Sequence, residues 1–333
     1  MIRILFTLFL ICLAPFAQAR CLEKPDISPQ TLTQLRAKAA QAPFHRGNLW
    51  QVQKDGVTSY VFGTMHLYDP RHETLLERLK PLIASTEQTL VEITNESQAE
   101  MKTLFGQNPA LYSITEGPSL MDRLGPEAWA KLVEKLQGRG MPPFMAAKFK
   151  PWFLGFSMML PKCALEDLKA KRFGIDKGIE ATAKSLGKPM QSLDDVGTLL
   201  ALFSKDPLPK QVEDMRWSLM LDLPEDPTTS GIIAFYFQEE AQVAWVYTLH
   251  YFETLGQTLL PEDADKLKAI TTQLMDELLI GRNQQWMETL VPELSRTPSF
   301  VAVGALHLPG EYGVLRLLET QGFEVQPLAM KLP

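Results

Sequence analysis

Two of the five histidines occupy the same short motif near opposite ends of a 333-residue chain. His66 closes the stretch Gly63–His66 after a short apolar run, and His307 closes Gly304–His307 after another. Glycine at a strand end leaves room for a ligand, and a histidine three residues later would face the crevice outside the strand ends, where open α/β sheets bind ligands. Two such imidazoles could hold a divalent metal ion or divide acid and base work.

A third ligand would complete a metal site, and Glu92 is the best candidate. It lies in the apolar stretch Leu90–Ile93, where a buried carboxylate is costly unless a cation or a hydrogen-bond donor compensates it. The alternative is a side chain that points outward on an alternating strand. The sequence leaves both possibilities open.

A second polar group is the pair Arg282 and Asn283 inside a long helical stretch. Such a pair commonly forms a solvated helix face, but a guanidinium can also clamp a substrate carboxylate in bidentate fashion. Asp176 and the pair Asp194 and Asp195 precede helical stretches, and we interpret them first as N-caps.

The other three histidines are weaker candidates. His72 follows a proline-containing turn and is expected to be exposed, while His250 lies among aromatic residues and suits a core or groove position. His45 is expected in a loop. We assign none of them to the chemistry.

The elements that must position these side chains follow from residue periodicity and turn signals. β-structure is expected at both ends of the chain and helices between them, which predicts an α/β fold whose central sheet is built from N- and C-terminal strands, with a large helical insertion. The predicted strands are 48–53 and 57–62 as a hairpin, 89–93, 189–193, 299–303 and 322–328. The predicted helices are 31–41, 73–84, several between 96 and 160, 174–186, 196–204, 209–221, 229–255, 262–297 and 308–321.

The first nineteen residues have the features of a secretory signal peptide. Arg3 precedes an apolar run, and Ala17–Ala19 forms a small-residue cleavage signal. Cleavage would leave residues 20–333 as a single α/β domain whose helical middle covers about 96–297. No later segment reaches roughly 18 consecutive apolar residues, so no transmembrane segment is expected after removal of the signal. A periplasmic protein is predicted.

Charge and cysteine content restrict the function further. The net charge is −6 and no basic patch suggests a nucleic-acid partner. Cys12 would leave with the signal peptide, which places Cys21 and Cys163 together in an oxidising compartment and predicts a disulfide between them. The alternative is two separate thiols.

The chain resembles the TraB/PrgY/GumN family, to which the Tiki metalloproteases are related. The resemblance covers roughly residues 45–328 and rests on five stretches: FGTMHL, TLVEI, FGIDKGIEATAKSLGKPMQSLDD, GRNQQW and FVAVGALHLPGEYGVLRLLETQGFEV. It implies a metal-dependent hydrolase site made from His66, His307 and Glu92, with Arg282 and Asn283 in support. One departure is Asp194, where relatives often have a glutamate that would reach further.

We therefore expect an exported metallohydrolase, a peptidase, that acts on a peptide or small-molecule substrate. His66, His307 and Glu92 would bind Mn²⁺, Co²⁺ or Zn²⁺, and Glu92 could instead be the general base; Arg282 would steady a substrate carboxylate or an oxyanion. One alternative is a non-catalytic binding protein that captures a peptide, haem or another small ligand, because no dense ligand motif such as H-E-x-x-H occurs. Another is metal-free hydrolysis with one histidine as general base.

Overall fold

The computed structural model describes residues 21, 27–223 and 227–330, which contain one six-stranded mixed sheet in the order β4-β3-β5-β2-β1-β6. The strands are β1 (Leu49–Lys54), β2 (Val57–Thr64), β3 (Gln88–Val91), β4 (Met190–Ser192), β5 (Ser299–Gly304) and β6 (Glu324–Pro327). Strands β2, β5, β3 and β4 are parallel, and β1 pairs antiparallel with β2 and β6. The predicted sheet built from both ends of the chain is therefore confirmed.

Helices make up most of the remaining described chain. The α-helices of the first half are α1 (Pro29–Ala39), α2 (Arg71–Ser85), α3 (Asn95–Gln107), α4 (Leu120–Leu124), α5 (Pro126–Leu136), α6 (Pro143–Ala146), α7 (Pro151–Met159) and α8 (Lys162–Lys169). Those of the second half are α9 (Ile175–Ser185), α10 (Val196–Ser204), α11 (Leu208–Met220), α12 (Thr229–Tyr236), α13 (Ala241–Gly256), α14 (Pro261–Met275), α15 (Arg282–Leu294) and α16 (Val314–Thr320). Short 3₁₀ turns are η1 (Pro109–Leu111) and η3 (Ala305–His307), and η2 (Asp276–Gly281) is a π-helix.

Two apolar layers cover the sheet. On one face, Phe62 and Phe300 pack against α2, α9 and α12 through residues such as Leu79 and Ile179. On the other face, Val61 and Val301 pack against α15 and α16. Neighbouring strand residues point to opposite faces, and the uninterrupted apolar run of β5 is typical of a strand buried on both sides.

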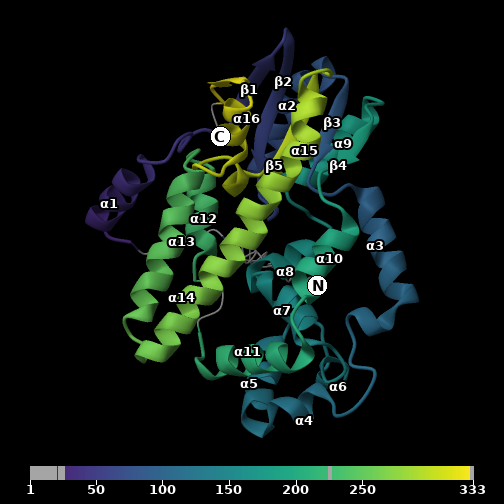
Figure 1. Cartoon of the computed structure of the whole chain (residues 1–333), viewed down its shortest axis with the longest axis vertical. Coiled ribbons are helices and arrows are strands. Elements are labelled where there is room, and N and C mark those ends of the chain that lie inside the picture. Colours follow the sequence, from purple (N-terminus) through teal and green to yellow (C-terminus); the bar gives the residue numbers. More distant parts are fainter. Residues whose placement is uncertain (1–20, 22–26, 224–226, 331–333) are drawn as a thin grey trace, which may run out of the picture.

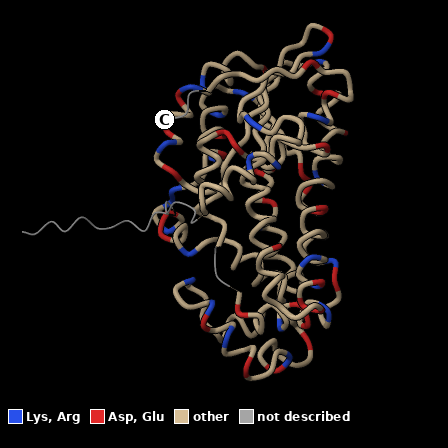
Figure 2. Tube along the Cα trace, turned by 90° about the vertical axis from the view of Figure 1, so that its left-hand side faces the viewer, with Lys and Arg blue, Asp and Glu red and all other residues tan. Residues whose placement is uncertain are grey.

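The helical middle of the chain lies below the sheet in the view of Figure 1. Helices α4, α5, α7 and α11 share a separate apolar core that includes Leu124, Leu132 and Leu154. The middle is not a continuous insertion, because α9 and β4 return to the sheet before α10 leaves it again. Acidic and basic residues are interspersed along both the upper and the lower parts of the trace (Figure 2).

Three helix predictions need correction. The stretch 229–255 forms two helices, because the backbone turns at Glu239, which has a positive φ of 58°. The stretch 262–297 is divided by the π-helix η2. The last helix begins at Val314 rather than 308, since residues 305–307 form a 3₁₀ turn and the chain turns again through Gly310 at φ 92°.

The predicted disulfide is present, and it joins Cys21 to Cys163 at the start of α8. Cys21 packs against the apolar core on the Phe62 face of the sheet, so the bond ties the N-terminal part of the described chain to the helical part. The predicted signal peptide lies outside the described residues. Among the described residues, no helix has the length and apolar character needed to cross a membrane.

Removing this disulfide should destabilise the protein. The bond spans 142 residues, and loop-entropy arguments give a closure of that length up to about 5 kcal/mol of stabilisation. We expect Cys163→Ala to lower the free energy of unfolding in urea by several kcal/mol under oxidising conditions. Wild type in reducing agent should match the variant, and equal stability of the oxidised wild type and the variant would contradict the prediction.

The prediction that His72 is exposed is wrong. Its ring is buried at the start of α2, stacked on Phe237 with centroids 5.7 Å apart and edge-on to Tyr236 at 6.2 Å. Neither ring nitrogen has a hydrogen-bond partner among the described residues. Burial lowers the pKa of His72 to about 4, because the apolar surroundings disfavour the charged imidazolium.

His72 should make stability depend on pH. Its folded pKa of about 4 lies below the value of about 6.5 for an unfolded chain, so its contribution is complete above pH 6.5 and is lost as the pH falls towards 4. The loss from this group alone is at most about 3 kcal/mol. His72→Phe should therefore flatten the pH dependence of urea midpoints between pH 6.5 and 4, whereas His45→Phe in an exposed loop should not. Identical pH curves for wild type and His72→Phe would rule this out.

Candidate active site

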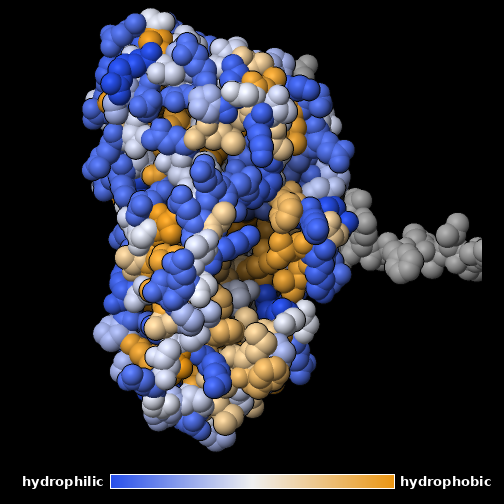
Figure 3. Space-filling view, turned by 90° about the vertical axis from the view of Figure 1, so that its right-hand side faces the viewer, coloured by the Kyte–Doolittle hydropathy of each residue, from blue (hydrophilic) through white to orange (hydrophobic). Residues whose placement is uncertain are grey.

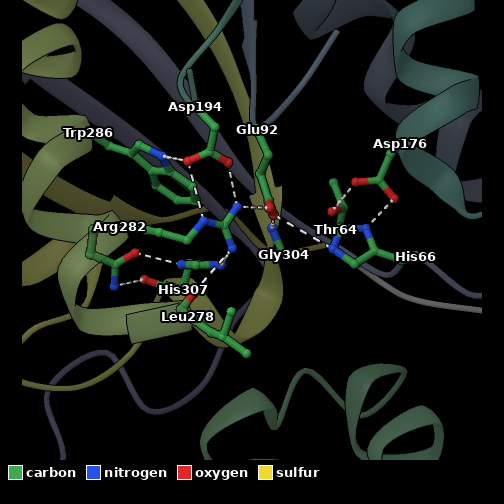
Figure 4. A network of polar contacts seen from close by, with 11 residues as sticks. Thr64, His66, Glu92, Asp176, Asp194, Leu278, Arg282, Trp286, Gly304 and His307 are labelled. Atoms are coloured by element: carbon green, nitrogen blue, oxygen red, sulfur yellow. Dashed lines mark hydrogen bonds and ion pairs between the residues drawn. The ribbon is translucent and has the colours of Figure 1, made fainter. Parts of the chain in front are cut away.

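Five polar side chains meet where β2, β3 and β5 end, at the carboxyl edge of the parallel strands (Figure 4). They are the five residues that the sequence singled out: His66, Glu92, Arg282, Asn283 and His307. Thr64 at the end of β2 pairs with Gly304 at the end of β5, so the two glycine-histidine motifs lie side by side. A Cβ added at Gly304 would lie 3.1 Å from Glu92 Oε1, 3.4 Å from His307 Cδ2 and 3.6 Å from His66 Nε2. The absence of a side chain there keeps the space between these groups open.

His66 is held by a carboxylate from α9. Its Nδ1 donates to Asp176 Oδ2 at 3.0 Å, and Thr64 Oγ1 donates to the other oxygen of Asp176 at 2.5 Å. The negative charge of Asp176 raises the pKa of His66 to about 10. The bond at Nδ1 leaves Nε2 pointing at Glu92 Oε1, 3.7 Å away. The His66 side chain is 65% exposed, so solvent reaches the site from this side.

Helix α9 can approach His66 because residue 174 has no side chain. A Cβ at Gly174 would lie only 2.3 Å from the carbonyl oxygen of Met65 and 2.4 Å from the carbonyl carbon of His66. Glycine there lets the first turn of α9, which carries Asp176, pack directly on the backbone of the histidine loop.

His307 is held in an equivalent way from α15. Its Nδ1 donates to Asn283 Oδ1 at 2.6 Å, while the Asn283 amide donates to the carbonyl oxygen of Tyr312 at 2.8 Å. The imidazole packs on the indole of Trp286 with centroids 4.5 Å apart. Burial lowers the pKa of His307 to about 3, so the ring is neutral and its Nε2 carries a lone pair.

Glu92 lies between the two histidines, one residue after the end of β3. Oε1 accepts from the Gly304 backbone N–H at 2.6 Å, and Oε2 accepts from Arg282 Nη2 at 2.5 Å. Burial opposes ionisation, yet the neighbouring imidazoles and the guanidinium hold the pKa of Glu92 at about 2. The carboxylate is therefore charged at neutral pH and faces into the site, so the alternative of an outward-pointing side chain is wrong.

Arg282 is enclosed by protein groups. Besides Glu92, it donates to both oxygens of Asp194, at 3.3 and 2.6 Å, and Nη1 donates to the carbonyl oxygen of Leu278 at 3.1 Å. Nη1 also faces His307 Nε2 at 3.3 Å. Neither Arg282 nor Asn283 belongs to a solvated helix face, because both point into the site.

The helix carrying Arg282 is irregular at this point. The π-helix η2 ends at Gly281, directly before Arg282, and supplies the Leu278 carbonyl that the guanidinium contacts. Single π-turns inside α-helices occur frequently at functional sites, because the extra residue changes the direction of the side chains that follow.

Sequence reasoning missed the roles of Asp176 and Asp194. Asp176 does not cap α9, whose N-cap is Gly174 with no side-chain bond, and instead binds His66 and Thr64. Asp194 accepts from Trp286 Nε1 at 2.8 Å as well as from Arg282. Asp195 alone is a cap, accepting from the Thr198 backbone N–H. The signal that could have identified Asp194 is a carboxylate within two residues of the end of a parallel strand, as for Glu92 after β3.

The types of side chain at the site, two imidazoles and a carboxylate, are ones that divalent ions such as Zn²⁺ commonly bind. Both imidazoles have Nδ1 bound to a side-chain oxygen, as metal-binding histidines commonly do, and His66 Nε2 and His307 Cδ2 both border the open space at Gly304. In the part of the chain that the structure describes, however, no three histidine, cysteine, aspartate or glutamate residues stand close enough to share an ion. Arg282 Nη1 lies against Nε2 of His307 instead.

The charge of Asp176 should control the protonation of His66. Asp176→Asn keeps a similar shape but removes the charge, so the pKa of His66 should fall from about 10 towards 6.5. An NMR titration of the His66 ring protons measures this value. Asp195→Asn, which alters only the cap of α10, is the matched control and should leave it unchanged. A pKa near 6.5 for His66 in wild type would show that Asp176 does not act in this way.

Comparison with known protein families agrees with the resemblance that the sequence motifs indicate. The sequence model of the TraB/PrgY/gumN family matches residues 48–327, which include β1 through β6 and every site residue described above. No protein of curated function matches the chain. The match extends over well more than half of the 333 residues, so this chain belongs to the TraB/PrgY/gumN family.

Proposed function

We propose that the protein is a metal-dependent hydrolase that cleaves polypeptides. One observation carries the proposal: two histidines that follow adjacent parallel strands each have Nδ1 held by a side-chain oxygen, and both rings border the space that Gly304 leaves open beside the Glu92 carboxylate. His66, His307 and Glu92 would hold the ion, which supplies an activated water nucleophile at neutral pH when bound.

The charges of the site support a divalent cation. The site contains three carboxylates and one guanidinium: Glu92 and Asp194 pair with Arg282, and Asp176 pairs with His66. When both imidazoles are neutral, two negative charges remain, which one divalent ion would balance. Because His66 is protonated in the free protein, uptake of the ion should release its proton, as is usual when a metal replaces a proton on a ligand.

The surrounding residues would prepare the site rather than react. Asp176 and Asn283 fix the ring orientations of the two histidines. Arg282 and the Gly304 N–H keep Glu92 ionised and pointed inward. Arg282 lies next to the space where a substrate carbonyl would develop negative charge, and Nη1 is its nitrogen nearest to His307.

Metal-free hydrolysis through His66 is less well supported. An imidazole whose pKa is about 10 is protonated at neutral pH and cannot accept a proton from water. His307 is neutral, but its Nε2 faces a guanidinium. A binding protein without turnover would need neither an ionised Glu92 nor oriented imidazoles.

An exported location is part of the proposal. The Cys21–Cys163 bond forms most readily in an oxidising compartment such as the periplasm. The same location would supply polypeptide substrates outside the cytoplasm.

Metal binding can be measured without knowing the substrate. Titration calorimetry of residues 20–333 with Mn²⁺, Co²⁺ and Zn²⁺, in two buffers of different ionisation enthalpy, should show one bound ion and release of about one proton near neutral pH. At a hundredfold excess over the dissociation constant, the ion should stabilise the fold by about 2.7 kcal/mol. His66→Ala, His307→Ala and Glu92→Gln should each remove this stabilisation, whereas His45→Ala should retain it.

Gly304→Ala is a sharper variant because it changes no donor atom. Its Cβ would enter the space between Glu92 Oε1 and His66 Nε2 and should weaken metal binding while the protein stays folded. A wild-type protein whose melting ignores chelator and all three ions would contradict the metallohydrolase proposal. So would activity retained by His66→Ala.

A further inference from the structure

Two helices below the site carry apolar side chains that the fold covers only in part. Helix α10 has the sequence VGTLLALFS and no fully buried residue, and on α7 Phe156 and Met159 are 56% and 61% exposed. Figure 3 shows apolar residues gathered in a hollow at mid-height of one face, between the upper and lower parts of the molecule. Contiguous exposed apolar surface of this kind marks a site of interaction.

This apolar surface is continuous with the candidate active site. Helix α10 is capped by Asp195, directly after Asp194, which binds Arg282. On the other side, the half-buried residues Leu278–Ile280 of η2 lead into Arg282. Lys205, which follows α10, forms an ion pair with Glu277 of η2. Helix α10 and the segment Leu278–Ile280 therefore each have one end next to the site, and the pair of Lys205 and Glu277 joins their other ends.

A cavity lies at the far end of α10. Its volume is about 450 Å³, and its apolar walls include Trp152, Met158, Phe203 and Met215. Phe203 also packs edge-on against the exposed Phe156, with centroids 5.5 Å apart. The nine residues of α10 span roughly 13 Å, which is the length of about four residues of an extended chain.

The charges around this cavity are already engaged within the protein. Lys135 Nζ donates to the carbonyl oxygen of Leu223 at 3.1 Å, and Asp214 pairs with Lys210 and Lys266 at 2.5 and 3.0 Å. Arg139, which also lines the cavity, donates to the carbonyl oxygens of Lys135 and Leu160, and Asp206 pairs with Lys210. Methionines in the cavity walls suit apolar side chains of varied shape, because the thioether side chain adapts to its partner.

The hollow is formed by α10, by Phe156 and Met159 of α7, and by the adjoining cavity. We infer that it binds an apolar stretch of the polypeptide substrate. An extended segment would run along α10 from the site and place a large apolar side chain in the cavity, about four residues from the bond to be cleaved. This inference rests on the proposed hydrolase function and specifies its substrate class: polypeptides with exposed apolar segments, such as unfolded chains.

Binding of a matched pair of peptides tests the inference. Both carry a fluorescent label and have equal length and charge, but one contains Leu and Phe where the other contains Ser and Gln. Fluorescence anisotropy with residues 20–333 and no added metal should show the apolar peptide binding at least about tenfold more tightly, since burying one such side chain is worth about 1.5–3 kcal/mol. Moving a single Phe along the peptide should give the tightest binding at one position.

Variants of exposed residues locate the surface. The double change Phe156→Asp and Met159→Asp should weaken binding of the apolar peptide about tenfold or more without altering the melting temperature. Phe144→Asp is the control, because Phe144 is 73% exposed and lies on α6, which contributes no residue to the cavity, whereas α7 contributes Trp152 and Met158. Equal binding of the two peptides, or a double variant that binds like wild type, would overturn the inference.

Two further measurements separate the possible failures. Dodecanoate that binds in the hollow when the apolar peptide does not would assign the surface to lipid and overturn the inference. Peptide binding that the double variant loses, without metal-dependent cleavage, would support the hollow as a polypeptide site and contradict only the hydrolase proposal. Metal-dependent cleavage of both peptides at equal rates would support the hydrolase proposal and overturn the inference that the hollow selects apolar segments.

Discussion

The candidate active site depends on one buried cation held between two carboxylates. Arg282 joins Glu92, which follows β3, to Asp194, which follows β4, and the helix α15 carries it across the sheet edge. Buried charges are costly unless they are paired and hydrogen-bonded, and here every carboxylate oxygen of the two partners has a donor. Removing Arg282 would leave two buried carboxylates without the guanidinium that pairs with both of them. The ionised state of Glu92 and the neutral state of His307 both follow from this environment.

The two histidines are oriented from opposite faces of the sheet. Helix α9, on the face that includes Phe62, supplies Asp176 to His66. Helix α15, on the face that includes Val301, supplies Asn283 to His307. Parallel strands bring their carboxyl ends to one edge, so the layered packing places both histidines beside Glu92. The site is therefore assembled from both layers that cover the sheet, and packing on either face affects its geometry.

The helical part combines a conventional core with an uncovered surface. Helices α4, α5, α7 and α11 bury their own apolar residues, and the charges on their outer faces pair locally. Helix α10 differs, because its apolar composition is not matched by burial. The position of α10 directly after Asp194 places this surface beside the candidate active site, and in the function that we propose the helical middle selects substrates as well as stabilising the fold.

The sequence by itself determined the α/β class, the strands at both ends and the five polar residues that meet in the site. These features rest on local patterns: apolar strands ending in glycine, helix periodicity and two equivalent histidine motifs. Tertiary structure alone decided which partners those residues have. Asp176 and Asp194 resemble helix caps in sequence, and His72 resembles an exposed turn residue, because local pattern records neither the 2.5 Å bond from Thr64 nor the aromatic rings around His72. The direction of the Arg282 side chain likewise depended on the π-turn before it and on two carboxylates, 190 and 88 residues away in sequence, that only folding brings together.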